Sequence, residues 1–134
     1  MTVELTPLYT LTGTAVVEKL GKVQDGERIK IEFRGKSAAG SPVEGKAHGS
    51  TWILIGPLGP GDTNAVQEII LPSGERLVVE LRGYTLMPNS EEMEIRTCGV
   101  IRTSAASLTH LNGHLALVVQ ALTGETIKVQ AYHV

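Results

Sequence analysis

The stretch VVELRGYTLM, residues 78–87, alternates two sets of side chains, and one set holds the groups best able to do chemistry: Glu80, Arg82 and Tyr84. Residues two apart on a strand lie about 7 Å apart on one face, so these head groups can meet. A buried carboxyl beside a guanidinium can act as a general acid or base. We therefore predict that Glu80 moves a proton, Arg82 holds Glu80 and stabilises negative charge, and Tyr84 donates to a substrate oxygen.

Two turns decide whether these side chains point into a core. LPSGER predicts a two-residue turn at Ser73-Gly74, and MPNSEE predicts a turn centred on Asn89 and Ser90. The other face of this register carries most of the charge, so we expect the first face inside. That face holds the candidate site residues Glu80, Arg82 and Tyr84 together with the candidate substrate contacts Gln67, Met93, Ile95 and Thr97. In the alternative orientation, Glu80 and Arg82 form an exposed ion pair of little energetic consequence.

The elements that must position these residues are strands punctuated by glycines and prolines. A single short helical stretch is expected within residues 103–113. Closing so many hairpin-linked strands into a barrel removes their exposed edges. We therefore predict one all-β domain over residues 1–134, an antiparallel barrel of about 8–10 strands that is calycin-like or lipocalin-like. The expected strands are Leu8–Val17, Glu27–Arg34, Val43–Ile55, Ala65–Leu71, Arg76–Met87, Glu92–Thr103, Leu115–Leu122 and Glu125–Val134.

Composition excludes several classes of function. The 134 residues carry a net charge of −2 and only 4% aromatic residues, which gives little support for binding phosphate backbones or stacking bases. The single cysteine, Cys98, excludes an intrachain disulfide. No apolar run of membrane-spanning length or signal-like segment is present. We expect a soluble cytoplasmic protein without nucleic-acid or membrane partners.

The strand around VEGKAHGSTWIL leaves two alternatives open. Its small residues could pack inward, or His48 and Trp52 could line the cavity. We expect His48 and Trp52 to face the cavity. In the preceding strand, the charged residues that alternate with Ile29, Ile31 and Phe33 should face water.

Other motifs are set aside. His110 and His114 stand four residues apart, and a turn at Thr123-Gly124 would bring His133 near them, but surface histidines are more common than zinc ligands and Asn112-Gly113 interrupts a helix. The glycine-rich segment 56–63 lacks the Lys-Ser/Thr of a phosphate-binding loop. Neither motif supports a metal or a cofactor, so we predict none. No G-x-S-x-G motif is present, so nucleophilic catalysis is not supported.

Three motifs carry a resemblance to a known family. GSTW (49–52), RLVVELRGYTL (76–86) with a following strand that contains Gly99, and LTHLNG (108–113) leading to VQAYHV resemble a bacterial family of small β-barrel proteins catalogued as a domain of unknown function. The resemblance implies the barrel and no established activity. In size and in polar groups placed within a barrel, the chain is also similar in style to cofactor-free spiroacetal cyclases of polyketide biosynthesis.

These observations predict a cofactor-independent cyclase or isomerase that acts by general acid/base catalysis on a lipophilic, polyketide-type molecule inside the barrel. Spiroacetal formation is one such reaction. The alternative is a non-catalytic barrel that carries an apolar ligand. A third interpretation is a structural or oligomer-forming barrel, such as a homodimer, with a filled interior.

Overall fold

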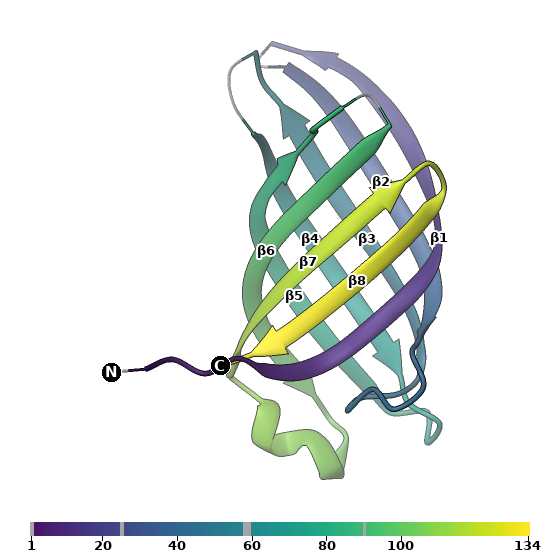
Figure 1. Ribbon diagram of the computed structural model, residues 1–134, viewed down its shortest axis with the longest axis vertical. Coiled ribbons are helices and arrows are strands. Elements are labelled where there is room, and N and C mark those ends of the chain that lie inside the picture. Colours follow the sequence, from purple (N-terminus) through teal and green to yellow (C-terminus); the bar gives the residue numbers. More distant parts are fainter. Residues whose placement is uncertain (1, 25, 58–59, 90) are drawn as a thin grey trace.

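The computed structural model describes residues 2–24, 26–57, 60–89 and 91–134. It shows a closed antiparallel barrel in which consecutive strands pair with each other and the first strand also pairs with the last (Figure 1). The predicted barrel, with its eight strands, is confirmed. A short 3-10 helix, η1 (Ala106–Leu111), lies between β6 and β7, where the helical stretch was expected. No helix among the described residues is long and apolar enough to cross a membrane. The strands are β1 (Thr6–Val23), β2 (Gly26–Ser37), β3 (Lys46–Ile55), β4 (Gly61–Ile70), β5 (Arg76–Leu86), β6 (Glu92–Thr103), β7 (Leu115–Thr123) and β8 (Thr126–His133).

The barrel closes where the first strand meets the last. β1 pairs with β8 from Thr6 opposite His133 to Thr14 opposite Thr126. β1 continues beyond the end of β8 and pairs there with β2, as far as Val23. A bulge in the β1–β8 ladder, between Pro7 and Tyr9, places two consecutive residues, Leu8 and Tyr9, in the interior, since both are 1% exposed.

Side chains alternate between an apolar interior and an outer surface along the strands, as barrel closure requires. β2 follows the predicted pattern, with Ile29, Ile31 and Phe33 buried. β5 buries Leu77, Val79 and Leu81, each at most 3% exposed. Further buried apolar residues come from the other strands, including Leu11, Ala15, Ala47, Ile53, Ala65, Ile69, Ile95, Ile101, Ala116, Val118, Leu122, Ile127, Val129 and Ala131.

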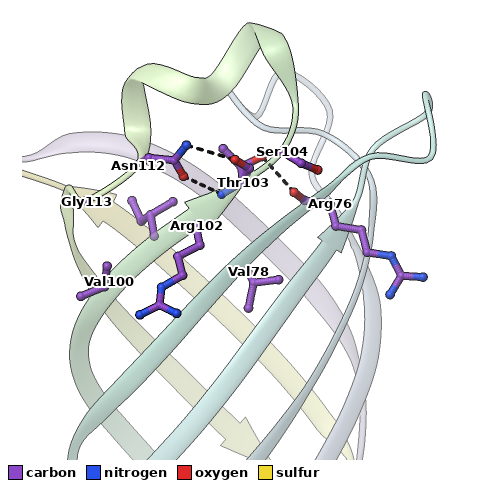
Figure 2. Close-up of a pocket in the computed structure, with 9 residues that line it drawn as sticks. Arg76, Val78, Val100, Arg102, Thr103, Ser104, Asn112 and Gly113 are labelled. Carbon is purple, nitrogen blue, oxygen red and sulfur yellow. Dashed lines mark hydrogen bonds between the residues drawn. The ribbon is translucent and has the colours of Figure 1, made fainter.

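The end of the barrel beneath η1 is closed by apolar side chains. Leu111 and Val43 are buried in the core cluster, and Leu108 packs against it. Figure 2 shows how Asn112 fastens this segment: its side-chain oxygen accepts from the Thr103 amide at 2.7 Å, and its side-chain nitrogen donates to the Thr103 carbonyl at 3.0 Å. The same view shows Thr103 donating through its hydroxyl to the Arg76 carbonyl, which ties β6 to β5.

The predicted register of β5 is wrong by one residue at its first turn. The Leu71 amide donates to the Glu75 carbonyl, so the loop holds three residues, Pro72, Ser73 and Gly74, where two were predicted. Gly74 has φ of +88°, which is the conformation that closes three-residue hairpin loops. As a result Ile69 lies opposite Leu77, where the two-residue turn placed Val78.

The second predicted turn is also displaced by one residue. Tyr84 lies opposite Arg96, where Ile95 was predicted, and Arg82 lies opposite Cys98, where Thr97 was predicted. One of the two residues predicted at the centre of this turn, Ser90, lies outside the described residues. Because both turns are displaced by one residue, the side chains of β4 and β6 keep their predicted inner faces. The side chains of β5, between the two turns, face the opposite way from the prediction.

Gly99 is one of several glycines at positions where two strands approach closely. A Cβ at Gly99 would collide with the backbone carbonyl of Glu80. We expect Gly99→Ala to lower the free energy of unfolding by about 1–3 kcal/mol or more, because backbone cannot move aside as a side chain can. Urea denaturation would measure it. Cys98→Ala, at the adjacent exposed position, is the control, and equal stabilities of the two variants would contradict the close approach.

Candidate functional site

The interior of the barrel contains several neutral polar side chains within apolar walls. Tyr9 lies among these polar groups and is itself 1% exposed. Among the described residues, no charged side chain is buried with them. The interior can therefore offer hydrogen bonds but no carboxylate or ammonium. The other buried polar side chains are Thr51, Thr63, Gln67, Thr85, Thr97 and Gln120.

Tyr9 reaches across the barrel from β1 to β4. Its hydroxyl donates to the Gln67 side-chain oxygen at 2.6 Å, and both side chains are 1% exposed. Burial raises the pKa of Tyr9 well above its usual value, because ionisation would place an unsolvated charge in the apolar interior. Tyr9 is therefore a neutral hydrogen-bond donor at physiological pH.

Two buried glutamines have hydrogen-bonding capacity that the protein does not use. Gln120 is 0% exposed, and neither its amide nitrogen nor its amide oxygen has a partner among the described residues. The Gln67 nitrogen is likewise buried and unpartnered, although its oxygen binds Tyr9. Buried polar groups are nearly always hydrogen-bonded, so three such atoms in one interior call for an explanation.

The buried threonines are largely satisfied by the protein. The hydroxyls of Thr63 and Thr85 lie 2.7 Å apart, and Thr63 also donates to the Gly61 carbonyl. Thr97 donates to the Val118 carbonyl at 3.2 Å. Three of the five buried side-chain atoms without a partner among the described residues therefore belong to Gln67 and Gln120, and the other two are the Nδ1 atoms of His114 and His133.

The three residues predicted to form an inward catalytic cluster lie on the outer surface. Glu80 and Arg82 are exposed, and Tyr84 is 57% exposed. Glu80 lies 3.7 Å from Arg102, and Arg82 donates to the Asn64 side-chain oxygen at 3.1 Å. The prediction that they face inward is wrong, because the inverted register of β5 reverses its faces. A buried proton-transferring pair of Glu80 and Arg82 does not exist.

The predicted substrate contacts divide between the two faces. His48 and Trp52 point outward, which contradicts their predicted place in the cavity; His48 lies 3.2 Å from Glu68, and the Lys30 ammonium lies 5.8 Å from the Trp52 ring. The small-residue alternative for β3 is the correct one. Four others take the predicted inner face: Gln67, Ile95 and Thr97 are buried, and Met93 is half-buried against the core. Their contact with a substrate stays a prediction.

The histidines near the closed end form a pair. The rings of His114 and His133 lie 5.3 Å apart in an edge-to-face arrangement. Burial and the nearby His114 and His110 lower the pKa of His133. Within the described part of the chain, no three histidine, cysteine or acidic residues are grouped so that they could hold a metal ion.

Comparisons with known proteins show the fold. No protein-family model and no curated protein matches the sequence, so the predicted family is not confirmed. A conserved protein of unknown function from Rhodopseudomonas palustris is 18% identical, with a TM-score of 0.80 over 99% of this chain and 98% of that chain. A β-barrel-like protein from Acinetobacter baumannii is 18% identical, with a TM-score of 0.81 over 99% and 96%. An enzyme from Penicillium herquei is 14% identical, with a TM-score of 0.70 over 97% and 92%.

The buried hydroxyl of Tyr9 makes stability depend on alkaline pH. In the unfolded chain Tyr9 ionises near pH 10, whereas the folded protein keeps the proton. Above pH 10 the unfolded state binds fewer protons, so this group lowers the free energy of unfolding by up to about 1.4 kcal/mol per pH unit. Below pH 10 the ionisation of Tyr9 does not change the free energy of unfolding.

We therefore expect the stability difference between the wild type and Tyr9→Phe to shrink as the pH rises above 10. Urea midpoints of both proteins at several alkaline pH values would measure this difference. A difference that stays constant across this range would contradict the assignment of a raised pKa to Tyr9.

Proposed function

We propose that this protein binds a neutral, lipophilic small molecule in the interior of its barrel, with Tyr9, Gln67 and Gln120 providing the hydrogen bonds. The observation that carries the proposal is the side-chain amide of Gln120, which is fully buried and has neither of its atoms partnered. Leaving a buried amide unsatisfied costs about 1–3 kcal/mol. A ligand carbonyl and hydroxyl would remove that cost.

The chemistry of the walls supports a neutral ligand. Ile95 and Val129 flank Gln120 on the neighbouring strands, and both are fully buried. An ionised group would meet no counter-ion there, and an unpaired buried charge is far more costly than a neutral polar group. The ligand class is therefore a lipophilic molecule with a few ketone, ester or hydroxyl oxygens.

A depression at the barrel end opposite η1 supports a route to this site. It is lined by residues that include Ile55, Gly61, Thr85 and Met87. Thr85 lies opposite Ile95, which lies opposite Gln120, so the depression and the unpartnered amide share one row of the barrel. Gln120 and its neighbours Ile95 and Val129 are fully buried, so an entering ligand must displace interior side chains. Ile55 and Met93 are half-buried and pack against the edge of the core cluster, so they are the side chains that an entering ligand would displace first.

Calorimetric titration with neutral ten-carbon probes tests this binding. We expect δ-decalactone, 2-decanone or 1-decanol to bind, and decanoate to bind at least tenfold more weakly because its charge would be buried. Gln120→Met keeps the side-chain shape and removes both hydrogen-bonding groups, so affinity should fall about tenfold to a hundredfold while stability without ligand is unchanged or higher.

The matched control is Gln130→Met, at an exposed glutamine on β8, which should leave affinity unchanged. Absence of binding by all three neutral probes would contradict the proposal. Equal affinity of the two methionine variants would also contradict it, because the Gln120 amide would then contribute nothing.

A second candidate is the cofactor-independent cyclase or isomerase. The Penicillium herquei protein with this fold is an enzyme, and Tyr9 could donate to a substrate oxygen if a substrate hydroxyl replaced it as the donor to Gln67. In spiroacetal closure, the hydroxyl of a hemiacetal would take up a proton from solvent and leave as water, aided by a hydrogen bond from Tyr9. A second substrate hydroxyl would then attack the same carbon and release its proton to solvent. Without a buried carboxylate, any acceleration would rest mainly on holding the substrate in its closing conformation.

Spiroacetal formation from 1,9-dihydroxynonan-5-one would test the cyclase. Closure forms two carbon–oxygen acetal bonds and releases one water. We expect the protein to accelerate closure, and Tyr9→Phe to lose about tenfold or more of the acceleration while it still binds δ-decalactone. Tyr132→Phe, at a half-buried position outside the set of buried polar side chains, is the control. Binding of the ketone without acceleration would favour the carrier over the cyclase.

A further inference from the structure

The outer face of β7 is apolar along the strand. Leu115 is 56% exposed, and Leu117 and Val119 are each 37% exposed; with exposed Ala121 they form the β7 patch. The inner face of the same strand is also mainly apolar. Strands that are apolar on both faces are typical of sheets covered on both sides.

The neighbouring outer surfaces differ from the β7 patch. On β6, Glu94 and Arg96 point outward and lie 3.0 Å apart. On β8 the outward residues include Lys128 and Gln130, both exposed. Figure 1 shows β7 between these two strands, so polar and charged residues border the patch beside Val119 and Ala121, whereas Cys98 and Tyr132 flank Leu117. Exposed apolar patches with such borders mark association surfaces.

We propose that a second copy of this chain covers the β7 patch in a homodimer whose two-fold axis runs along β7. Sheets that pack face to face keep their strands within about 30° of alignment, so the two β7 strands would lie along each other. A closed dimer of this kind uses the same patch on both copies. The inference is independent of ligand binding inside the barrel.

The charges bordering the patch select the second copy as the occupant. Glu94 on β6 lies opposite Ala121, and Ala121 lies opposite Lys128 on β8, so the three residues form one row across the patch. A two-fold axis along β7 places β6 of one copy over β8 of the other at the same level. Each Glu94 then faces Lys128 of the second copy, and this pair of opposite charges occurs twice.

The next row of residues fits the same arrangement. Arg96, Val119 and Gln130 lie in register, so each Arg96 would face the neutral amide of Gln130 of the second copy. An axis perpendicular to the strands at this level would place Arg96 over Arg96. Because facing like charges repel, a perpendicular axis at the level of Val119 is disfavoured, whereas the axis along β7 keeps Arg96 away from its own copy.

Sedimentation equilibrium over a range of protein concentrations tests the dimer. We expect the wild type to dimerise reversibly and Val119→Lys to weaken dimerisation at least tenfold, because two lysines would meet at the axis. Val66→Lys is the matched control: Val66 is 39% exposed on the outer face of β4, and its replacement should leave dimerisation unchanged.

Charge reversal tests the direction of the axis. Glu94→Lys and Lys128→Glu should each weaken the dimer, and the double variant should restore it, because opposite charges face each other again. A wild type that stays monomeric would overturn the proposal, as would equal effects of Val119→Lys and Val66→Lys. A double variant that dimerises no better than either single variant would overturn the two-fold arrangement.

Discussion

Barrel closure imposes one constraint from which most of the structure follows: each strand must divide its side chains between a dry interior and the outer surface. On β5 this division buries Leu77, Val79 and Leu81 and leaves Glu80 and Arg82 in water. A shift of one residue would exchange the two sets. Burying those charges without the solvent around them would cost several kcal/mol or more for each unpaired group. The strand's own composition therefore fixes its register, and the loops adopt whatever length that register needs.

The sequence allows the fold to be predicted because its signals are local. Glycines and prolines separate the strands, and alternation within each strand identifies a sheet with one wet face, so all eight strands and the short helix overlap their predicted ranges. β1 extends six residues beyond the predicted end at Val17, and β4 begins four residues before the predicted start at Ala65. The prediction of β5 used the turn sequences instead of the strand's own alternation. At Ser73-Gly74, a glycine that closes a three-residue loop looks the same in sequence as one that closes a two-residue turn. The contrast between Leu77, Val79 and Leu81 and their charged neighbours was the more reliable signal, since each buried charge has a large energetic cost.

The candidate site is less predictable because its contacts cross the barrel. Gln67 and Thr97 could be placed inside from the alternation of β4 and β6. Tyr9 is in phase with buried Leu11 and Ala15, so alternation within β1 could have placed it inside, but its partner is 58 positions away in the chain and could not be predicted. Gln120 did have a signal: it is the one polar residue in the run LALVVQAL, at a position in phase with buried Ala116 and Val118. A polar residue in phase with a buried face indicates a hydrogen-bonding group in the interior.

The pairing of β1 with β8 also has a consequence for how the chain is made. β1 emerges from the ribosome before the other strands of the barrel, and its partner on that side, β8, is the last strand of the barrel, so the barrel cannot close until all of its strands have been made. Until then β1 has an open edge, and folding through such distant contacts is slow. The C-terminal half of β1 extends beyond β8. It carries Glu18, Lys19 and Lys22 and a bulge near Leu20. Charges and bulges of this kind discourage pairing with the wrong strand. They would protect the growing chain as well as the finished barrel.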